Sequence, residues 1–158
     1  MVSLNCRRVL GHLIALSALA LPSTLTSCGA DSPGGRANDV EGRYWQLVRL
    51  RDAAIASVPP PKGAYLMLDS HTQRLIGSGG CNQLMGTYHL DGHSLTFGPI
   101  AATRMACLDE HVTATETNFL SALGDVKGWK MEGKQLALTD ASGRTLAQFE
   151  ERAPGAGQ

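Results

Sequence analysis

The chain has 158 residues, with 14 Lys and Arg against 14 Asp and Glu, so its formal net charge is zero. A chain of this length holds one compact domain once an export signal is removed, and it is too short for two. No cluster of Lys and Arg with interleaved aromatic residues follows the N-terminal region, so no nucleic-acid partner is expected.

An apolar segment near the N-terminus ends in Leu25-Thr26-Ser27-Cys28. Arg7 and Arg8 precede the apolar residues Val9 to Leu21, and small or apolar residues precede the cysteine, as in a processed bacterial lipoprotein signal. We predict that residues 1–27 are removed and that Cys28 carries the lipid. Cleavage at another bond remains an alternative, and so does an uncleaved membrane helix, which the short apolar run disfavours.

Gly29 follows the lipidated cysteine, where known lipoprotein sorting places Asp for retention at the inner membrane. We therefore expect a lipid-anchored protein at the outer membrane, facing the periplasm. Residues 28–39 are rich in Gly, Ser, Pro, Asn and Asp and predict a flexible tether. The domain is expected over residues 40–152, and a disordered tail over 153–158.

The first strand is predicted at Tyr44–Leu50, where aromatic and β-branched residues alternate with polar ones. Trp45, Leu47 and the stem of Arg49 are expected to face one side. Asp52–Gly63 is predicted to be a loop, because it contains three consecutive prolines that cannot donate to a sheet.

A hairpin is predicted next, with Ala64–Asp69 pairing with Gln73–Gly77 through a turn at Ser70-His71. The glycine-dense stretch Gly77–Asn82 then indicates positive φ angles or close backbone approach rather than regular pairing. We expect a structural corner at this point.

The strongest hairpin signal joins Gly86–Leu90 to Ser94–Phe97 through a turn at Asp91-Gly92. The same pattern recurs near the C-terminus. Three further strands are predicted there, at Trp129–Met131, Gln135–Thr139 and Thr145–Phe149. Such short connections favour an antiparallel sheet.

One segment has helical spacing, from Asp109 as N-cap to Leu123, with Gly124 just past the end. Phe119, Leu120 and Leu123 are expected to form its buried stripe. The fold class is therefore α+β, with seven or eight short strands in a curled antiparallel sheet and one helix, inserted late, that covers one face or end.

Four cysteines are present, of which Cys6 leaves with the signal and Cys28 takes the lipid. Cys81 and Cys107 remain as an even pair in an oxidising compartment, which predicts a disulfide. Two buried, unpaired thiols are the alternative.

Five short motifs follow one another along the chain in a recognisable series. It comprises Gly79-Gly80-Cys81-Asn82, Gly86-Thr87-Tyr88, Gly92 to Leu95, Thr103-Arg104-Met105-Ala106-Cys107 and Glu116 to Leu123. The chain closely resembles the META domain family, the HslJ-like proteins, over nearly the whole mature domain. The resemblance implies a small antiparallel, partly barrel-like sheet with a single helix.

The resemblance also implies a poorly defined function. Members of the family are associated with heat-shock response, with tolerance of drugs such as novobiocin, or with virulence, and bacterial members are often secreted or lipid-anchored. The fold has been likened to lipid-binding pilotins that assist secretin assembly. The family brings no catalytic residues to this chain.

Three polar residues stand near the cysteines or on the helix: Asn82, Arg104 and Glu116. Asn82 is expected to hydrogen-bond backbone groups in the glycine corner, and Arg104 to pair with a carboxylate, Asp109 or Glu116, or else to hold an anionic ligand. Glu116 lies among apolar helix residues, so we expect a partly buried carboxylate whose partner is Arg104.

Catalytic and metal chemistry find little support in the sequence. Cys81 has no histidine marked as its base, so a structural disulfide is preferred to a nucleophile. His89, Asp91 and His93 alternate like ligands on one strand face, but the turn at Asp91-Gly92 is expected to break that geometry. No metal and no cofactor are expected.

The sequence therefore predicts a non-enzymatic envelope lipoprotein, anchored to the membrane by its N-terminal lipid, that contributes to stress or drug tolerance as a binding or assembly module. A pilotin-like factor is an alternative, with an apolar ligand or envelope partner in a groove lined by Phe119, Leu123 and Trp129. A small periplasmic hydrolase or redox enzyme using Cys81 is another. A monomer is expected.

Overall fold

The computed structural model describes residues 39–56 and 62–153. The predicted signal peptide, the lipidation site at Cys28, nearly all of the tether, the three prolines at 59–61 and residues 154–158 lie outside the described residues. The expectations that rest on them therefore remain predictions.

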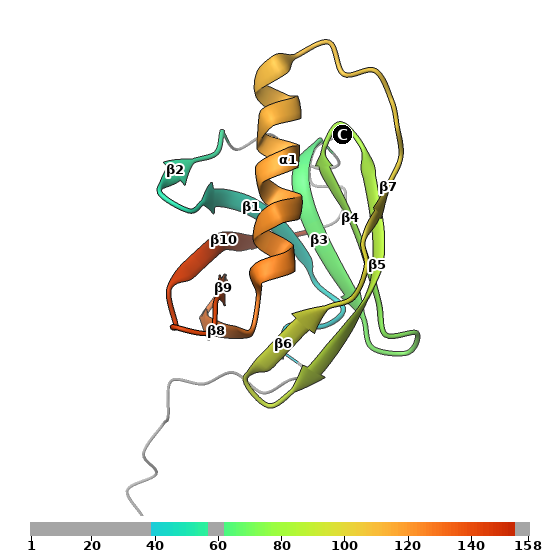
Figure 1. The fold of residues 1–158 in the computed structure, drawn as a ribbon. Coiled ribbons are helices and arrows are strands. Elements are labelled where there is room, and N and C mark those ends of the chain that lie inside the picture. Colours follow the sequence, from blue (N-terminus) through green and yellow to red (C-terminus); the bar gives the residue numbers. More distant parts are fainter. Residues whose placement is uncertain (1–38, 57–61, 154–158) are drawn as a thin grey trace, which may run out of the picture. The chain divides into compact units, whose positions relative to one another are not determined.

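The described residues form an antiparallel β-barrel with one helix (Figure 1). Its eight strands are β1 (Tyr44–Leu50), β3 (Gly63–Asp69), β4 (Arg74–Gly80), β5 (Gln83–Asp91), β6 (Ser94–Phe97), β8 (Gly128–Glu132), β9 (Gln135–Thr139) and β10 (Thr145–Arg152). The order around the barrel is β10-β9-β8-β6-β5-β4-β3-β1, and β1 pairs with β10 to close it. The predicted α+β class is confirmed, and the sheet closes completely.

Two short strands lie beside this path. β2 (Ala53–Ala54) pairs with the end of β1, and β7 (Ala101–Ala102) pairs with β5. The prediction that Asp52–Gly63 is all loop is therefore wrong at Ala53 and Ala54, whose backbone extends the hairpin at the end of β1, and at Gly63, which begins β3.

The helix α1 (Glu110–Asp125) packs against β4, β10, β1 and β6. In Figure 1 it lies across the barrel, with β3, β4 and β5 on one side and β1 and β10 on the other. Its N-cap is Asp109, as predicted, and the Asp109 carboxylate accepts hydrogen bonds from the backbone N–H groups of His111 and Val112. The helix runs one residue past Gly124 and its C-cap is Val126.

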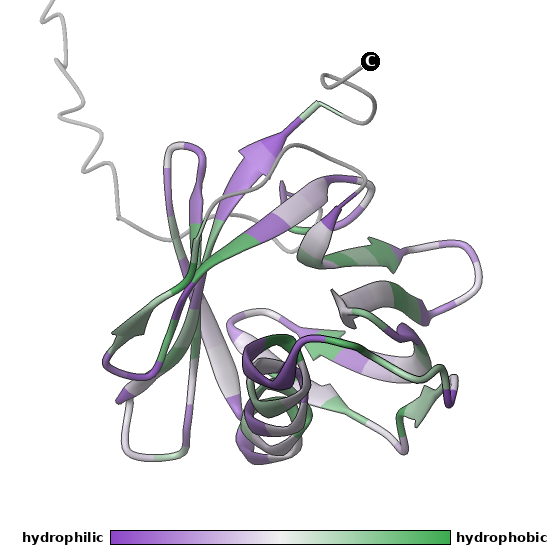
Figure 2. Ribbon diagram, turned by 90° about the horizontal axis from the view of Figure 1, so that it is seen from above, coloured by the Kyte–Doolittle hydropathy of each residue, from purple (hydrophilic) through white to green (hydrophobic). Residues whose placement is uncertain are grey.

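One continuous core fills the space between α1 and the strands. Viewed from above, the strands curve round this space and α1 is seen end-on against it (Figure 2). Trp45, Leu47, Phe119, Leu123 and Phe149 are all 0% exposed. Leu120 is only partly buried, so the predicted helix stripe is confirmed at two of its three positions.

Two sequence expectations about the strands need correction. Arg49 is exposed instead of facing the core with Trp45 and Leu47, because a β-bulge between Leu47 and Arg49 breaks the alternation of β1. The glycine-dense stretch is also regularly paired, since β4 continues to Gly80, opposite β3. Close approach does occur there, and the φ angle of Gly80 is +109°.

Candidate functional site

The disulfide joins the β4–β5 turn to the segment that leads into α1. Cys81 and Cys107 are bonded, with their Cα atoms 6.1 Å apart and a sequence separation of 26. The predicted pairing is therefore confirmed. It ties the segment from 98 to 109, which holds only the two strand residues of β7, to the rim of the barrel.

Asn82 is the centre of the polar cluster beside this disulfide. Its backbone N–H donates to Glu116 Oε2 at 2.8 Å, and its side-chain Nδ2 donates to Glu116 Oε1 at 2.6 Å. Its Oδ1 accepts from Thr103 Oγ1 at 2.9 Å and from the backbone N–H of Met105 at 2.8 Å. One amide therefore holds together the β4–β5 turn, the segment before α1, and the helix itself.

The carboxylate of Glu116 needs room beside the backbone of β4. Glu116 is 8% exposed, and a Cβ on Gly79 would lie 2.8 Å from Glu116 Cδ and closer still to its Cγ. Only glycine lets the helix carboxylate approach the strand this closely. The buried carboxylate predicted at Glu116 is confirmed, and Gly79 is the reason that it fits.

The predicted partner of Glu116 is wrong. Arg104 is exposed, and none of the ion pairs between described residues includes it. Its two neighbours bond Asn82 instead, Thr103 through its hydroxyl and Met105 through its backbone N–H. The other expected partner, Asp109, is used as the helix cap.

This cluster is built as a structural tie. The sulfur of Cys81 is bonded to Cys107, and both oxygens of Glu116 accept hydrogen bonds from Asn82. A nucleophile or a base would require those bonds to be broken first. The sequence thus identified Cys81, Cys107, Asn82 and Glu116. The side chain of Asn82, however, bonds Glu116 and the segment before α1, and not backbone groups of the glycine corner as predicted.

The histidines named in the sequence lie apart from this corner. His89 is on β5, and His93 lies in the β5–β6 turn, with its ring centroid 5.5 Å from that of Trp129. Among residues 39–56 and 62–153, no group of three or more His, Cys, Asp and Glu side chains could hold a metal ion.

Two tyrosines have strongly shifted acidities. Burial raises the pKa of Tyr44 to about 12, with the neighbouring Tyr65 adding to the shift. The ring of Tyr44 stacks on Tyr65 at a centroid distance of 4.5 Å, and its buried hydroxyl has no hydrogen-bond partner in the described part of the chain. Burial, followed by the hydrogen bond to the Glu41 carboxylate, also raises the pKa of Tyr88.

An apolar hollow occurs beside α1, although not where the sequence placed it. Phe119, Leu123 and Trp129 are at most 2% exposed and belong to the solid core. A hollow of about 500 Å³ lies instead against the N-terminal half of α1. Its mainly apolar lining includes Ala54, Ile55, Ala64, Gly79, Gly80 and Val112.

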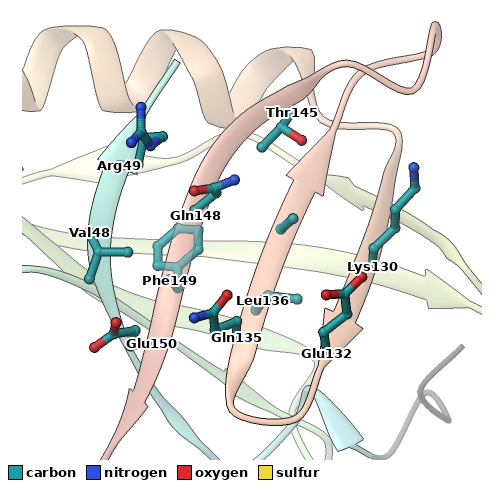
Figure 3. A pocket seen from close by; sticks show the side chains of 11 residues that line it. Val48, Arg49, Lys130, Glu132, Gln135, Leu136, Thr145, Gln148, Phe149 and Glu150 are labelled. Carbon is teal, nitrogen blue, oxygen red and sulfur yellow. The ribbon is translucent and has the colours of Figure 1, made fainter. Parts of the chain in front are cut away.

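A second hollow, of about 430 Å³, lies on the outer face of β1, β10, β9 and β8 (Figure 3). We call it the outer trough. Its polar lining consists of Arg49, Lys130, Glu132, Gln135, Thr145, Gln148 and Glu150. This trough is not predicted from the sequence. The alternate polar positions of the C-terminal strands were visible in the sequence, but their alignment across four strands was not.

The described part of the chain contains no helix with the length and hydropathy of a membrane span.

The comparisons with known proteins concern the whole barrel. An NMR structure of a protein from Burkholderia xenovorans is similar, with a TM-score of 0.58 and 27% identity, covering 84% of this chain and 99% of that one. Another protein's NMR structure has a TM-score of 0.57 and 19% identity, covering 72% of this chain and 92% of its own. The crystal structure of a DUF4847 family protein from Bacteroides vulgatus has a TM-score of 0.50 and 15% identity, covering 72% and 94%.

The last two structures, below 25% identity, show the fold alone. No curated protein matches the chain. The model of the META domain matches residues 38–153, which include every strand and the helix described above. The chain therefore belongs to the META domain family.

Proposed function

We propose that this chain is a non-enzymatic lipoprotein of the cell envelope, whose META domain serves as a binding or assembly module in stress or drug tolerance. The disulfide between Cys81 and Cys107 carries the proposal. Disulfides form and persist in oxidising compartments, so this bond supports export of the domain. Export agrees with the signal pattern that ends at Cys28, and Gly29 favours the outer membrane.

The state of the polar corner supports a role without catalysis. Cys81 is held in the disulfide and Glu116 is held by Asn82, so the two residue types best suited to nucleophilic or basic chemistry there are occupied. A closed barrel with a tied helix is a rigid support for a binding surface.

Membrane fractionation tests the location. Replacing Cys28 with alanine should release the protein from the membrane fraction, whereas Cys6→Ala, which changes a cysteine inside the predicted signal, should leave it there. Alkylation of intact cells before lysis should find Cys81 and Cys107 protected. Retention of the Cys28→Ala protein, or free thiols in the cell, would contradict the proposal.

A stress role is tested by deleting the gene and measuring survival under heat and under novobiocin. Survival should fall, and expression of the wild-type chain should restore it. A strain that expresses only the Cys28→Ala protein should remain sensitive if anchoring is required. Unchanged survival of the deletion strain under both conditions would remove the proposed role.

The apolar hollow beside α1 favours a second candidate, a pilotin-like factor that binds a lipid tail or a peptide. Its volume of about 500 Å³ and its lining by Ile55, Ala64 and Val112 suit a narrow apolar group. Native mass spectrometry of protein purified gently from its own envelope should then show a bound molecule. Val112→Trp would fill the hollow and should abolish that bound mass, whereas a mass retained by this variant counts against the hollow as the site.

A further inference from the structure

We propose that the outer trough binds a small zwitterionic peptide, with the peptide carboxylate toward Arg49 and Lys130 and the peptide ammonium toward Glu132 and Glu150. The inference concerns a surface that the disulfide and the Glu116 cluster do not include. It therefore holds or fails independently of the cellular location proposed above.

The strand register sorts the charges of the trough into two rows. Arg49 is opposite Gln148, Gln148 is opposite Ala137, and Ala137 is opposite Lys130, which forms one row across four strands. The next row on the same face runs from Glu150 through Gln135 to Glu132. The first row carries the two cations and the second carries the two carboxylates.

The trough is hollow for identifiable reasons. Ala137, the smallest side chain of the cation row, stands between Gln148 and Lys130 and leaves space at its centre. Register shifts also occur in both β1, between Leu47 and Arg49, and β10, between Thr145 and Ala147. β-Bulges bend strands and re-aim side chains, and these two lie at the edge of the trough.

The polar side chains of the trough are not paired with one another. Within the described residues, the side chains of Lys130, Glu132, Gln135 and Gln148 form no hydrogen bond or ion pair. Arg49 makes only one bond of 3.4 Å, to the carbonyl of Asp52, so its charge is not neutralised. Glu150 is the exception, because it is paired with Arg152 at 2.6 Å. Figure 3 shows Arg49 on one flank of the trough and Lys130 and Glu132 on the other.

The row spacing sets the size of the ligand. Neighbouring rows on one face are two residues apart along a strand, which is about 7 Å. An extended dipeptide spans about the same distance between its ammonium and its carboxylate. Gln148 lies within the cation row and Gln135 within the carboxylate row, and their amides can hydrogen-bond the peptide group of the ligand. Ala137 leaves room for a small side chain of the ligand.

Isothermal titration calorimetry of the purified, disulfide-bonded chain with L-alanyl-L-alanine tests the proposal. We expect binding with a Kd of about 1 mM or tighter. Blocking the peptide ammonium by acetylation, or its carboxylate by amidation, should each weaken binding by roughly tenfold. Ala137→Leu, which fills the trough, should abolish binding.

Charge variants show which end binds where. The double variant Arg49→Gln, Lys130→Gln should bind the free dipeptide as weakly as the wild type binds the amidated one. Amidation of the peptide should cause no further loss of affinity in this double variant. Glu132→Gln should bind the free dipeptide as weakly as the wild type binds the acetylated one, and acetylation should cause no further loss of affinity in this variant. Arg74→Gln is the matched control, because Arg74 is also an exposed strand arginine but lies on β4, outside the trough.

Several results would overturn the inference. They are no binding of the dipeptide by the wild-type chain, equal binding of free and blocked peptides, and equal losses in Arg74→Gln and in the double variant. Circular dichroism checks that Ala137→Leu folds. The charge variants alter exposed side chains only, so they test the proposal even if Ala137→Leu does not fold.

Discussion

Replacing Glu116 with alanine tests whether the buried carboxylate holds α1 to the barrel. Glu116 is 8% exposed and accepts two hydrogen bonds from Asn82, at 2.8 and 2.6 Å. Its removal leaves two donors of Asn82 without their acceptor, at a cost of about 1–3 kcal/mol each. Loss of the buried charge offsets part of this cost. We therefore expect the free energy of unfolding to fall by about 3 kcal/mol, or roughly 10 °C in Tm.

The matched control is Glu132→Ala. Glu132 is exposed on β8 and has no partner in the described residues, so its removal should change the free energy of unfolding by less than about 0.5 kcal/mol. Urea unfolding at neutral pH, followed by circular dichroism with the disulfide intact, measures both variants against the wild type. Equal losses in the two variants would refute the argument.

A double-mutant cycle with Gly79→Ala locates the interaction. A Cβ at position 79 would overlap the Glu116 side chain, so Gly79→Ala should destabilise the wild type by about 1–3 kcal/mol. In the Glu116→Ala background the overlapping atoms are gone, and most of this cost should disappear. Strictly additive losses would show that the two residues do not meet.

Three further predictions concern the disulfide, Tyr44 and Asp140. Replacing Cys81 and Cys107 together with serine should lower the free energy of unfolding, measured in urea, by about 3.5 kcal/mol, because the loop closed across a sequence separation of 26 is released. An unchanged free energy of unfolding would contradict this constraint. Tyr44→Phe should raise stability by about 1 kcal/mol at neutral pH, because it removes a buried hydroxyl without a partner. The wild type should also lose stability as pH rises from 10 toward 12, because Tyr44 ionises at a lower pH in the unfolded chain than in the folded one. An equal loss of stability in Tyr44→Phe over this pH range would count against this cause. Hydrogen bonds from Ser142 and Arg144 lower the pKa of Asp140 to about 2. The Tm of the wild type should therefore exceed that of Asp140→Asn by its full amount above about pH 4, and this difference in Tm should vanish as pH falls toward 2. A constant difference in Tm across that range would exclude the carboxylate as its source.

Local patterns were sufficient for the regular elements. β1 and β9 have the predicted bounds, because aromatic, β-branched and apolar residues spaced for a strand are a property of the segment itself. Asp109 was identified as the N-cap for the same reason, since the cap bonds only to the next few residues. The disulfide was predicted by counting, once Cys6 and Cys28 were assigned to export and lipidation.

The candidate site depended on contacts that local patterns do not encode. The apolar neighbours of Glu116 on its own helix indicated a buried carboxylate, but its partner lies 34 residues away in the β4–β5 turn. The sequence favoured Arg104 as the partner of Glu116 because its charge is opposite. Asn82 is the partner in the structure, because its amide can donate to Glu116 and accept from Thr103 at the same time.

The sequence by itself thus determined the eight strands of the barrel, the helix, the capping residue and the cysteine pair, each of which depends on neighbours in the chain or on composition. The tertiary structure alone decided that β1 and β10, about 100 residues apart, close the barrel, and that four strands align two rows of charge on its outer face. Register between distant strands follows from how the whole core packs, because a shift of one residue would turn every side chain of a strand to the opposite face.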